Sequence, residues 1–199
     1  MASFEDIKKK INAPSNILSE ENLDKLFALT EEVNYNQGET IVRLGGLDDN
    51  LYICKEGVFR GFFFQNDKEV TLYFGVEGDI IASFAPFYKG EPSAIIIEPC
   101  GDTTMLRISK ANLMKLISED LEIANWLVDK CFSQFYWLER KSTIVTGDAQ
   151  EKYSNLLRNR PELFQRVPLK TISSYLGITR QSLSRLRNPN YTKNSNPKK

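Results

Sequence analysis

Two hydrophobic periodicities divide the chain, and the pattern changes near residue 108. Between residues 33 and 108, short segments rich in β-branched and aromatic residues alternate with glycine-marked turns, which predicts the strands of a sandwich or jelly-roll barrel. Ahead of these strands, Ser19 is a good N-cap for a short helix with Leu23, Leu26 and Phe27 on one face. We expect strands at Thr40–Arg43, Leu51–Cys54, Phe59–Phe64, Val70–Phe74, Ile80–Ile81, Ala94–Ile97 and Thr104–Ile108.

A helical period follows between residues 114 and 145, where apolar residues recur in alternating steps of three and four. This is the a/d pattern of a coiled coil, and because no other segment matches its length, it predicts a parallel coiled coil with a second copy. Packing against the barrel is the alternative, and a second apolar stripe containing Ile123 and Trp126 can serve it simultaneously. The sequence Ser118-Glu119-Asp120 is typical of a helix N-terminus, so the long helix is expected to begin near residue 119. The candidate dimer seam consists of Leu121, Ala124, Val128, Cys131, Phe135 and Leu138.

Beyond residue 147 the pattern predicts a helix over Ala149–Asn159 and two short helices over Leu169–Leu176 and Thr179–Arg187. Gly177 ends the first short helix, because a left-handed backbone conformation costs little for glycine. The hydroxyl of Thr179 is a good N-cap for the second. A turn this short makes the two helices cross steeply and leaves the outer face of the second one free, which predicts a helix-turn-helix between roughly residues 165 and 190.

The outer face of the second short helix carries polar side chains suited to DNA bases. Arginine can hold guanine bidentately and glutamine can hold adenine, both from the major groove. Lys170, at the start of the first short helix, is placed to contact a phosphate. A helical hairpin with a solvated polar face is the alternative. The candidate base-reading residues are Arg180, Gln181, Ser184 and Arg185.

The distribution of charge favours the DNA-binding interpretation. The net charge is zero, but residues 1–147 hold 15 basic and 23 acidic side chains, whereas residues 148–199 hold 11 basic and 3 acidic ones. A basic end on an otherwise acidic chain is typical of a nucleic-acid-binding module. A solvated basic tail would give the same charge, so the helix-turn-helix pattern within it is what favours DNA.

Composition excludes several other classes of protein. The chain has no histidine and three widely spaced cysteines, so neither a metal site nor an iron–sulfur cluster is expected. Without histidine a metal-dependent jelly-roll enzyme of the cupin type is also excluded. The sequence contains no Ser–His, Cys–His or phosphate-loop motif, so we expect no catalysis. No apolar run is long enough for a membrane span, and the first residues lack a secretory signal, so a cytoplasmic location is expected.

Four short motifs in order, ahead of the heptad helix and the helix-turn-helix, make residues 17–187 resemble the Crp–Fnr family of bacterial transcription factors. The resemblance implies an α+β architecture with an N-terminal β-roll (a double-stranded β-helix or jelly roll), a long dimerisation helix and a C-terminal helix-turn-helix domain. The expected boundaries are residues 1–112, 113–146 and 147–199. The four motifs are Gly38-Glu39, Gly57, Gly78-Asp79 and Pro92-Ser93-Ala94.

The resemblance also assigns roles to residues. It places Arg180, Gln181 and Arg185 at the family's base-reading positions, and the candidate phosphate contacts are Lys170, Thr179 and Arg187. The family's β-hairpin wing is expected to be absent, because the chain stops soon after Arg187.

The sequence departs from the family's cyclic-AMP binders at two positions. These proteins carry a ribose-binding glutamate where this chain has Ser83, and a phosphate-binding arginine where it has Pro92. An anion buried without a cation is expensive, so cyclic AMP is not expected to be the effector. The candidate effector pocket, for another small molecule, consists of Gly78, Ala82, Ser83 and Ser93.

The sequence therefore predicts a homodimeric, DNA-binding transcription regulator without a cofactor. Its expected partners are double-stranded DNA and a second copy, with RNA polymerase and a small-molecule effector as further candidates. The alternative is a ligand-binding or protein-interaction module with a β-roll and a vestigial helix-turn-helix. Retained DNA affinity in a salt titration would distinguish the two.

Overall fold

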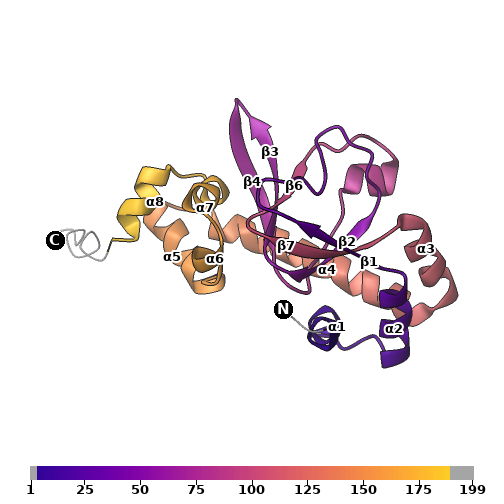
Figure 1. Ribbon diagram of the computed structural model, residues 1–199. Coiled ribbons are helices and arrows are strands. Elements are labelled where there is room, and N and C mark those ends of the chain that lie inside the picture. The colour runs from indigo at the N-terminus through magenta and orange to yellow at the C-terminus, as the bar shows by residue number, and fades with distance from the viewer. Residues whose placement is uncertain (1–3, 189–199) are drawn as a thin grey trace.

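The computed structural model describes residues 4–188 and combines a β-roll with a long helix and a cluster of C-terminal helices (Figure 1). The α+β architecture expected from the sequence is therefore confirmed. The long helix α4 runs along the roll, and the C-terminal helices lie at its far end (Figure 1). The elements are α1 (Phe4–Asn12), α2 (Glu20–Ala28), β1 (Glu31–Tyr35), β2 (Leu51–Glu56), β3 (Phe59–Gln65), β4 (Lys68–Gly75), β5 (Ile80–Ile81), the π-helix η1 (Ala85–Lys89), β6 (Ile96–Pro99), β7 (Thr103–Ile108), α3 (Lys110–Glu119), α4 (Leu121–Ile144), α5 (Ala149–Asn159), α6 (Leu163–Arg166), α7 (Leu169–Leu176) and α8 (Arg180–Leu186).

The roll consists of two antiparallel sheets. One has the strand order β1-β7-β2-β5, and the other has the order β4-β3-β6. Tyr52 on β2, Phe59 on β3 and Met105 on β7 are almost fully buried and belong to one core cluster between the strands. The strands β3 and β4 form a hairpin through Asn66 and Asp67, both with positive φ, as a tight two-residue hairpin turn requires.

Two expected strands of the roll are corrected by the structure, and two of its elements were not expected. The strand expected at Thr40–Arg43 is wrong, because there Val42 forms only an isolated bridge with Ile97. The strand expected at Ala94–Ile97 lies two residues later, at β6. The edge strand β1 was not expected, and neither was η1.

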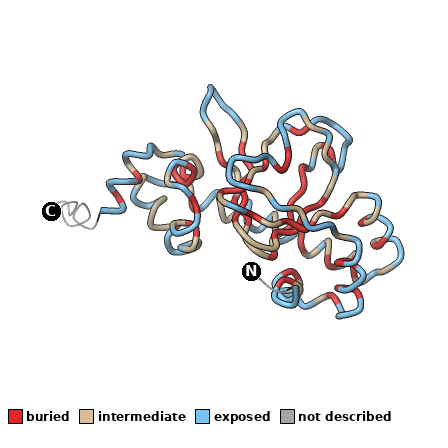
Figure 2. Tube along the Cα trace, viewed as in Figure 1, coloured by how far each residue is buried: buried red, intermediate tan, exposed pale blue. Residues whose placement is uncertain are grey.

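Helix α4 begins directly after its N-cap Asp120, whose side chain accepts a hydrogen bond from the backbone N–H of Glu122. The expected start near residue 119 is thus confirmed, and the first two apolar positions of the periodic pattern belong to the separate helix α3. One stripe of α4 packs inward, with Ile123 and Trp126 almost fully buried. Figure 2 shows buried segments both in the roll and in the C-terminal helices. The indole N–H of Trp126 donates to the carbonyl of Ile11 at 3.1 Å, which fixes α1 against α4.

The C-terminal helices share a core that extends onto the roll. Leu156, Ile172 and Leu183 are fully buried in this cluster, which also contains Val58 and Phe74 from the roll. The segment between α5 and α7, for which no element was expected, contains the single-turn helix α6. The expected loose tail and absent wing fall mainly on residues 189–199, which lie outside the described residues.

Candidate nucleic-acid interface and effector cavity

Helices α7 and α8 occupy the segment for which the sequence predicts a helix-turn-helix. Gly177 adopts φ +64° and its N–H donates to the carbonyl of Ser173, which ends α7. The hydroxyl of Thr179 accepts from the N–H of Ser182 at 3.1 Å, which starts α8. Both terminal signals are therefore confirmed. Because Leu183 is fully buried against α5 and α7, one face of α8 is inward and the other faces solvent.

The outward face of α8 carries the candidate base-reading residues. Arg180, Gln181, Ser184 and Arg185 are all exposed. Within residues 4–188, no hydrogen bond or ion pair engages the side chain of any of these four. Their polar groups are consequently available to an external partner. Arg187, which caps the C-terminus of α8, is also exposed.

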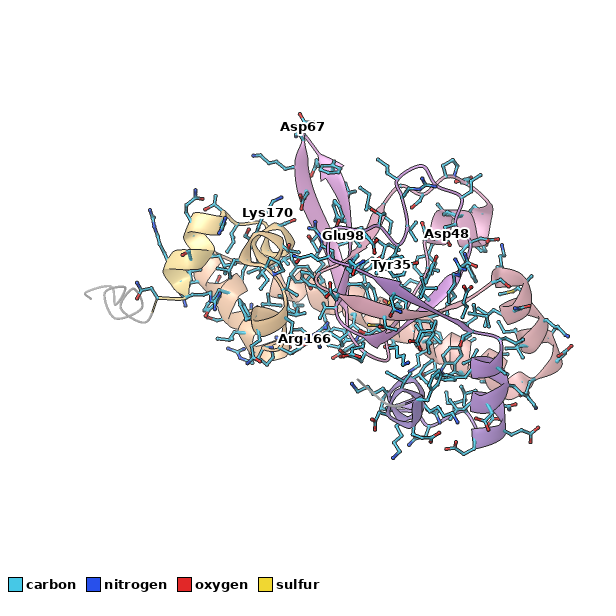
Figure 3. The ribbon with its side chains drawn as sticks, viewed as in Figure 1. Tyr35, Asp48, Asp67, Glu98, Arg166 and Lys170 are labelled. Atoms are coloured by element: carbon cyan, nitrogen blue, oxygen red, sulfur yellow. The ribbon has the colours of Figure 1, made fainter. Side chains whose placement is uncertain are left out.

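Lys170, a candidate phosphate contact, is engaged by the roll. Its ammonium lies 2.8 Å from a carboxylate oxygen of Glu69 on β4. The same carboxylate holds the buried guanidinium of Arg60 at 2.7 Å. Figure 3 shows Lys170 on the C-terminal helices beside the β3–β4 hairpin, whose tip is at Asp67. A phosphate contact by Lys170 would therefore require it to exchange Glu69 for DNA.

Ser174 also attaches α7 to strand β4. Its hydroxyl oxygen accepts from the backbone N–H of Thr71 at 3.0 Å and donates to the carbonyl of Glu69 at 2.7 Å. A second attachment comes from Arg166 at the end of α6, which forms an ion pair with Glu77 and donates to the carbonyl of Gly57 at 2.8 Å (Figure 3). The C-terminal helices are thus held on the roll by polar contacts at two separate points, one from α7 and one from α6.

The candidate dimer seam forms an uncovered stripe on α4. Leu121, Val128, Phe135 and Leu138 are 76%, 53%, 64% and 60% exposed, and Ala124 and Cys131 are partly exposed. The opposite stripe of the same helix is buried. Exposed apolar stripes of this length are typical of association surfaces, so the seam stays a candidate for one.

A cavity of about 520 Å³ lies between the roll, α4 and α7. Most of its wall is apolar, and it also receives Lys141 from α4 and Arg160 from the end of α5. The ammonium of Lys141 donates to the carbonyl of Thr71 at 2.8 Å and lies 5.0 Å from the centre of the Tyr175 ring. Burial lowers the pKa of Lys141 from 10.5 to about 8, because a desolvated ammonium is less stable than the neutral amine.

The structure does not bring the four candidate pocket residues together in one cavity. Ser83 lines the 520 Å³ cavity, whereas Ala82 lines a smaller one of about 60 Å³. Ser93 is buried beside Ser83, and their hydroxyls are 2.7 Å apart. Gly78 lies against Lys10 of α1, where a Cβ would come within 2.8 Å of that side chain.

The hydroxyls of Ser83 and Ser93 already have hydrogen-bond partners within the protein. Ser93 is hydrogen-bonded to Ser83 and donates at 2.8 Å to the backbone carbonyl of Ile95, so both hydroxyls are already engaged. The basic residues that line the cavity, Lys141 and Arg160, come from the C-terminal half of the chain.

Sequence reasoning missed the cavity's other polar residues. Lys141 comes after the last seam residue and Arg160 after the helix expected at Ala149–Asn159, and neither belongs to a motif. Tyr175 lies within the predicted helix-turn-helix. Tyr73 on β4 and Trp137 on α4 line the same cavity only after the elements pack. No local signal could have grouped them.

Residues 4–188 contain neither a cluster of metal ligands nor a helix suited to a membrane span. No three cysteine, aspartate, glutamate or histidine side chains in that range are grouped to hold a metal ion. Burial raises the pKa of the Cys100 thiol to about 12, which keeps it protonated. No helix in the described part of the chain is long and apolar enough to cross a membrane.

Comparison with known proteins gives a domain and a fold. Residues 32–120 match the family model of the cyclic nucleotide-binding domain. No curated protein is significantly similar to the sequence. The match ends at the start of α4, so the long helix and the C-terminal helices lie outside it.

Solved structures extend the similarity over most of the chain. FixK2 from Bradyrhizobium japonicum superposes with a TM-score of 0.69 at 19% identity, covering 82% of this chain and 85% of that one. A CooA mutant from Carboxydothermus hydrogenoformans gives 0.67 at 20% identity, covering 84% and 78%. A putative Crp/Fnr-family transcriptional regulator from Eubacterium rectale gives 0.64 at 18% identity, covering 86% and 83%. The chain therefore has the fold of Crp/Fnr-type regulators.

Proposed function

We propose that this protein is a sequence-specific DNA-binding transcription regulator of the Crp–Fnr type, and not an enzyme. The observation that carries the proposal is the outer face of α8, where Arg180, Gln181, Ser184 and Arg185 are exposed over a buried apolar core and have no partner among residues 4–188. In this proposal α7–α8 is a helix-turn-helix, and α8 lies in the major groove. Arginine and glutamine at these positions supply the bidentate contacts that distinguish guanine and adenine.

Phosphate contacts would position the helix without specifying sequence. Thr179 and Arg187 lie at the two ends of α8 and are exposed. Lys170 joins them once it leaves Glu69, since one ammonium cannot hold a carboxylate and a distant phosphate at the same time. The excess of basic side chains after residue 147 would add a non-specific attraction to DNA.

The proposed assembly is a homodimer through α4. Its seam residues, among them Val128 and Phe135, are exposed in the single chain and spaced to meet their equivalents in a second copy. The domain boundaries at residues 112 and 146 follow the same division into roll, dimerisation helix and DNA-binding part. A dimer would present two α8 helices to two half-sites.

We further propose that DNA binding does not require cyclic AMP. The Ser83 and Ser93 hydroxyls are hydrogen-bonded to each other, and Pro92 occupies the position where the cyclic-AMP binders of the family have an arginine. Two lost charge-assisted contacts, at about 1.5–3 kcal/mol each, correspond to roughly a hundredfold or more in affinity if they add. Calorimetry that detects micromolar binding of cyclic AMP would contradict this part of the proposal.

Selection of duplexes from a random DNA library tests the function. The unmodified protein should enrich a two-fold symmetric operator, and its affinity should fall steeply with salt. Arg180→Ala and Arg185→Ala should each weaken operator binding by roughly 1–3 kcal/mol and relax the preference at one base. Gln181→Glu should move the preferred base from adenine toward cytosine.

Arg158→Ala is the matched control, because Arg158 is an exposed arginine on α5 and not on α8. It should bind the same operator with little change in affinity. The same operator selected at the same affinity by both α8 arginine variants would remove α8 from the base-reading role. No enrichment by the unmodified protein would favour the module with a vestigial helix-turn-helix.

A further inference from the structure

The 520 Å³ cavity has a buried floor and an exposed rim. Phe74 and Ile81 are buried and form part of the floor, whereas Phe84, Phe135 and Leu138 are at least 60% exposed and form part of the rim. Its volume lies within the range of pockets that hold small organic ligands. Because two rim residues belong to the dimer seam, the second copy proposed above would cover that side of the cavity.

Six of the residues that line this cavity are aromatic, and they come from the roll, the long helix and the C-terminal helices. Two of them belong to β4, one to the segment before η1, two to α4 and one to α7. Flat, polarisable surfaces of this kind favour stacking or edge contacts with another ring. The six are Tyr73, Phe74, Phe84, Phe135, Trp137 and Tyr175.

The charge of the lining is entirely positive. No carboxylate is among the described residues that line the cavity. Arg160 already has a partner, since its Nε lies 2.6 Å from Glu162. Lys141 has none within residues 4–188, and only the Thr71 carbonyl and the Tyr175 ring contact its ammonium.

An ammonium held in an apolar wall without a carboxylate is an uncompensated charge. Its lowered pKa reports that cost, yet at about 8 it leaves Lys141 mainly protonated at neutral pH. An anion within the cavity would compensate it with a charge-assisted hydrogen bond. A multiply charged phosphate is a poor match for one such cation, particularly because Ser83 and Ser93 are engaged with each other.

We infer that the cavity binds a small aromatic carboxylate, whose ring packs among the aromatic side chains and whose carboxylate pairs with Lys141. The inference rests on the proposed function in one respect, since the partner's α4 closes the exposed rim. An ammonium has three N–H donors, so a bound carboxylate would accept from Lys141 beside the Thr71 carbonyl. Lys141 would thereby connect the ligand to β4, the strand that holds α7, because the backbone N–H of Thr71 also donates a hydrogen bond to the hydroxyl of Ser174.

Isothermal titration calorimetry with 2-naphthoate and the neutral isostere 2-naphthamide tests this assignment, with cyclic AMP as a third probe. The unmodified protein should bind 2-naphthoate at least about tenfold more tightly than 2-naphthamide. Lys141→Met should abolish this preference, because it keeps the apolar length of the side chain and removes the charge. Lys115→Met is the control, since Lys115 is an exposed lysine on α3 that does not line the cavity.

Four results would overturn the inference: equal affinity for the two naphthalene probes, a preference that persists in Lys141→Met, no binding of either probe, or tighter binding of cyclic AMP. Lys141→Gln replaces Lys141→Met if circular dichroism shows that the latter is unfolded. The operator selection is run on the same preparation without any probe. Specific DNA binding without naphthoate binding refutes only the cavity assignment, and naphthoate binding without DNA binding refutes only the proposed function.

Discussion

Phe135→Asp is expected to convert the proposed dimer into monomers. Phe135 is 64% exposed in the single chain, so a second copy can still remove more than half of its surface from water. Complete burial of such a side chain is worth about 1.5–3 kcal/mol, which leaves about 1–2 kcal/mol for the dimer contact. Because a two-fold dimer contains this contact twice, the substitution removes the contribution of both copies.

The two new carboxylates would add a larger penalty. Each one would lie in the apolar seam without a cation, and an unpaired buried charge costs several kcal/mol. Together the losses exceed about 5 kcal/mol, or more than a thousandfold in the dissociation constant. A dimer with a sub-micromolar dissociation constant would then be monomeric at micromolar concentration.

Sedimentation velocity measures this outcome directly. The unmodified protein should sediment with twice the 22.8 kDa mass of the chain, and Phe135→Asp with the single mass. Phe64→Asp is the matched control, because Phe64 is 54% exposed at the end of β3 and not on α4. A monomeric unmodified protein, or an unchanged dissociation constant for Phe135→Asp, would refute the argument that α4 is the dimer interface.

Three further predictions concern the C-terminal helices and the cavity. Gly177→Ala should destabilise the fold by about 1–2 kcal/mol, since alanine is strained at φ +64°, and thermal denaturation should show no such loss for Gly101→Ala, where φ is not positive and space is free. Ser174→Ala should accelerate hydrogen exchange of the Thr71 amide by roughly 5- to 150-fold, because a buried N–H loses its acceptor at a cost of about 1–3 kcal/mol; unchanged exchange would contradict the docking role. Between pH 8 and 10.5 the unfolded chain binds more protons at Lys141 than the folded one, so stability should rise with pH there. Lys141→Met should flatten this rise in chemical denaturation at several pH values, and it should also stabilise the protein at pH 7, because it removes a charge that burial destabilises.

The elements that depend on local signals were predictable from the sequence. Helices α7 and α8 have an apolar period, a glycine that ends one and a threonine that caps the other, all within about twenty residues. The start of α4 at Asp120 is likewise set by a capping side chain next to the residues it caps. Such signals act within one or two turns, so no tertiary information is needed to find them.

Elements whose stability comes from distant partners were missed or misplaced. Strand β1 is an edge strand with mostly exposed side chains, so it lacks an apolar alternation, and its pairing with β7 across some seventy residues defines it. Conversely, Thr40–Arg43 has strand-like composition, but Ile41 and Val42 both donate to the carbonyl of Ile97 and form no ladder. Composition alone cannot tell these cases apart.

The sequence by itself determined the order of roll, long helix and C-terminal helix pair, and the polar face of α8, because hydrophobic period and capping are properties of neighbouring residues. Only the tertiary structure decided which candidate residues meet. It separated Gly78 from Ser83, paired Lys170 with Glu69, and brought Lys141 to the wall of an aromatic cavity. These contacts join segments that lie far apart in the chain, and their energies depend on burial and on the distance between charges, which exist only once the segments have packed.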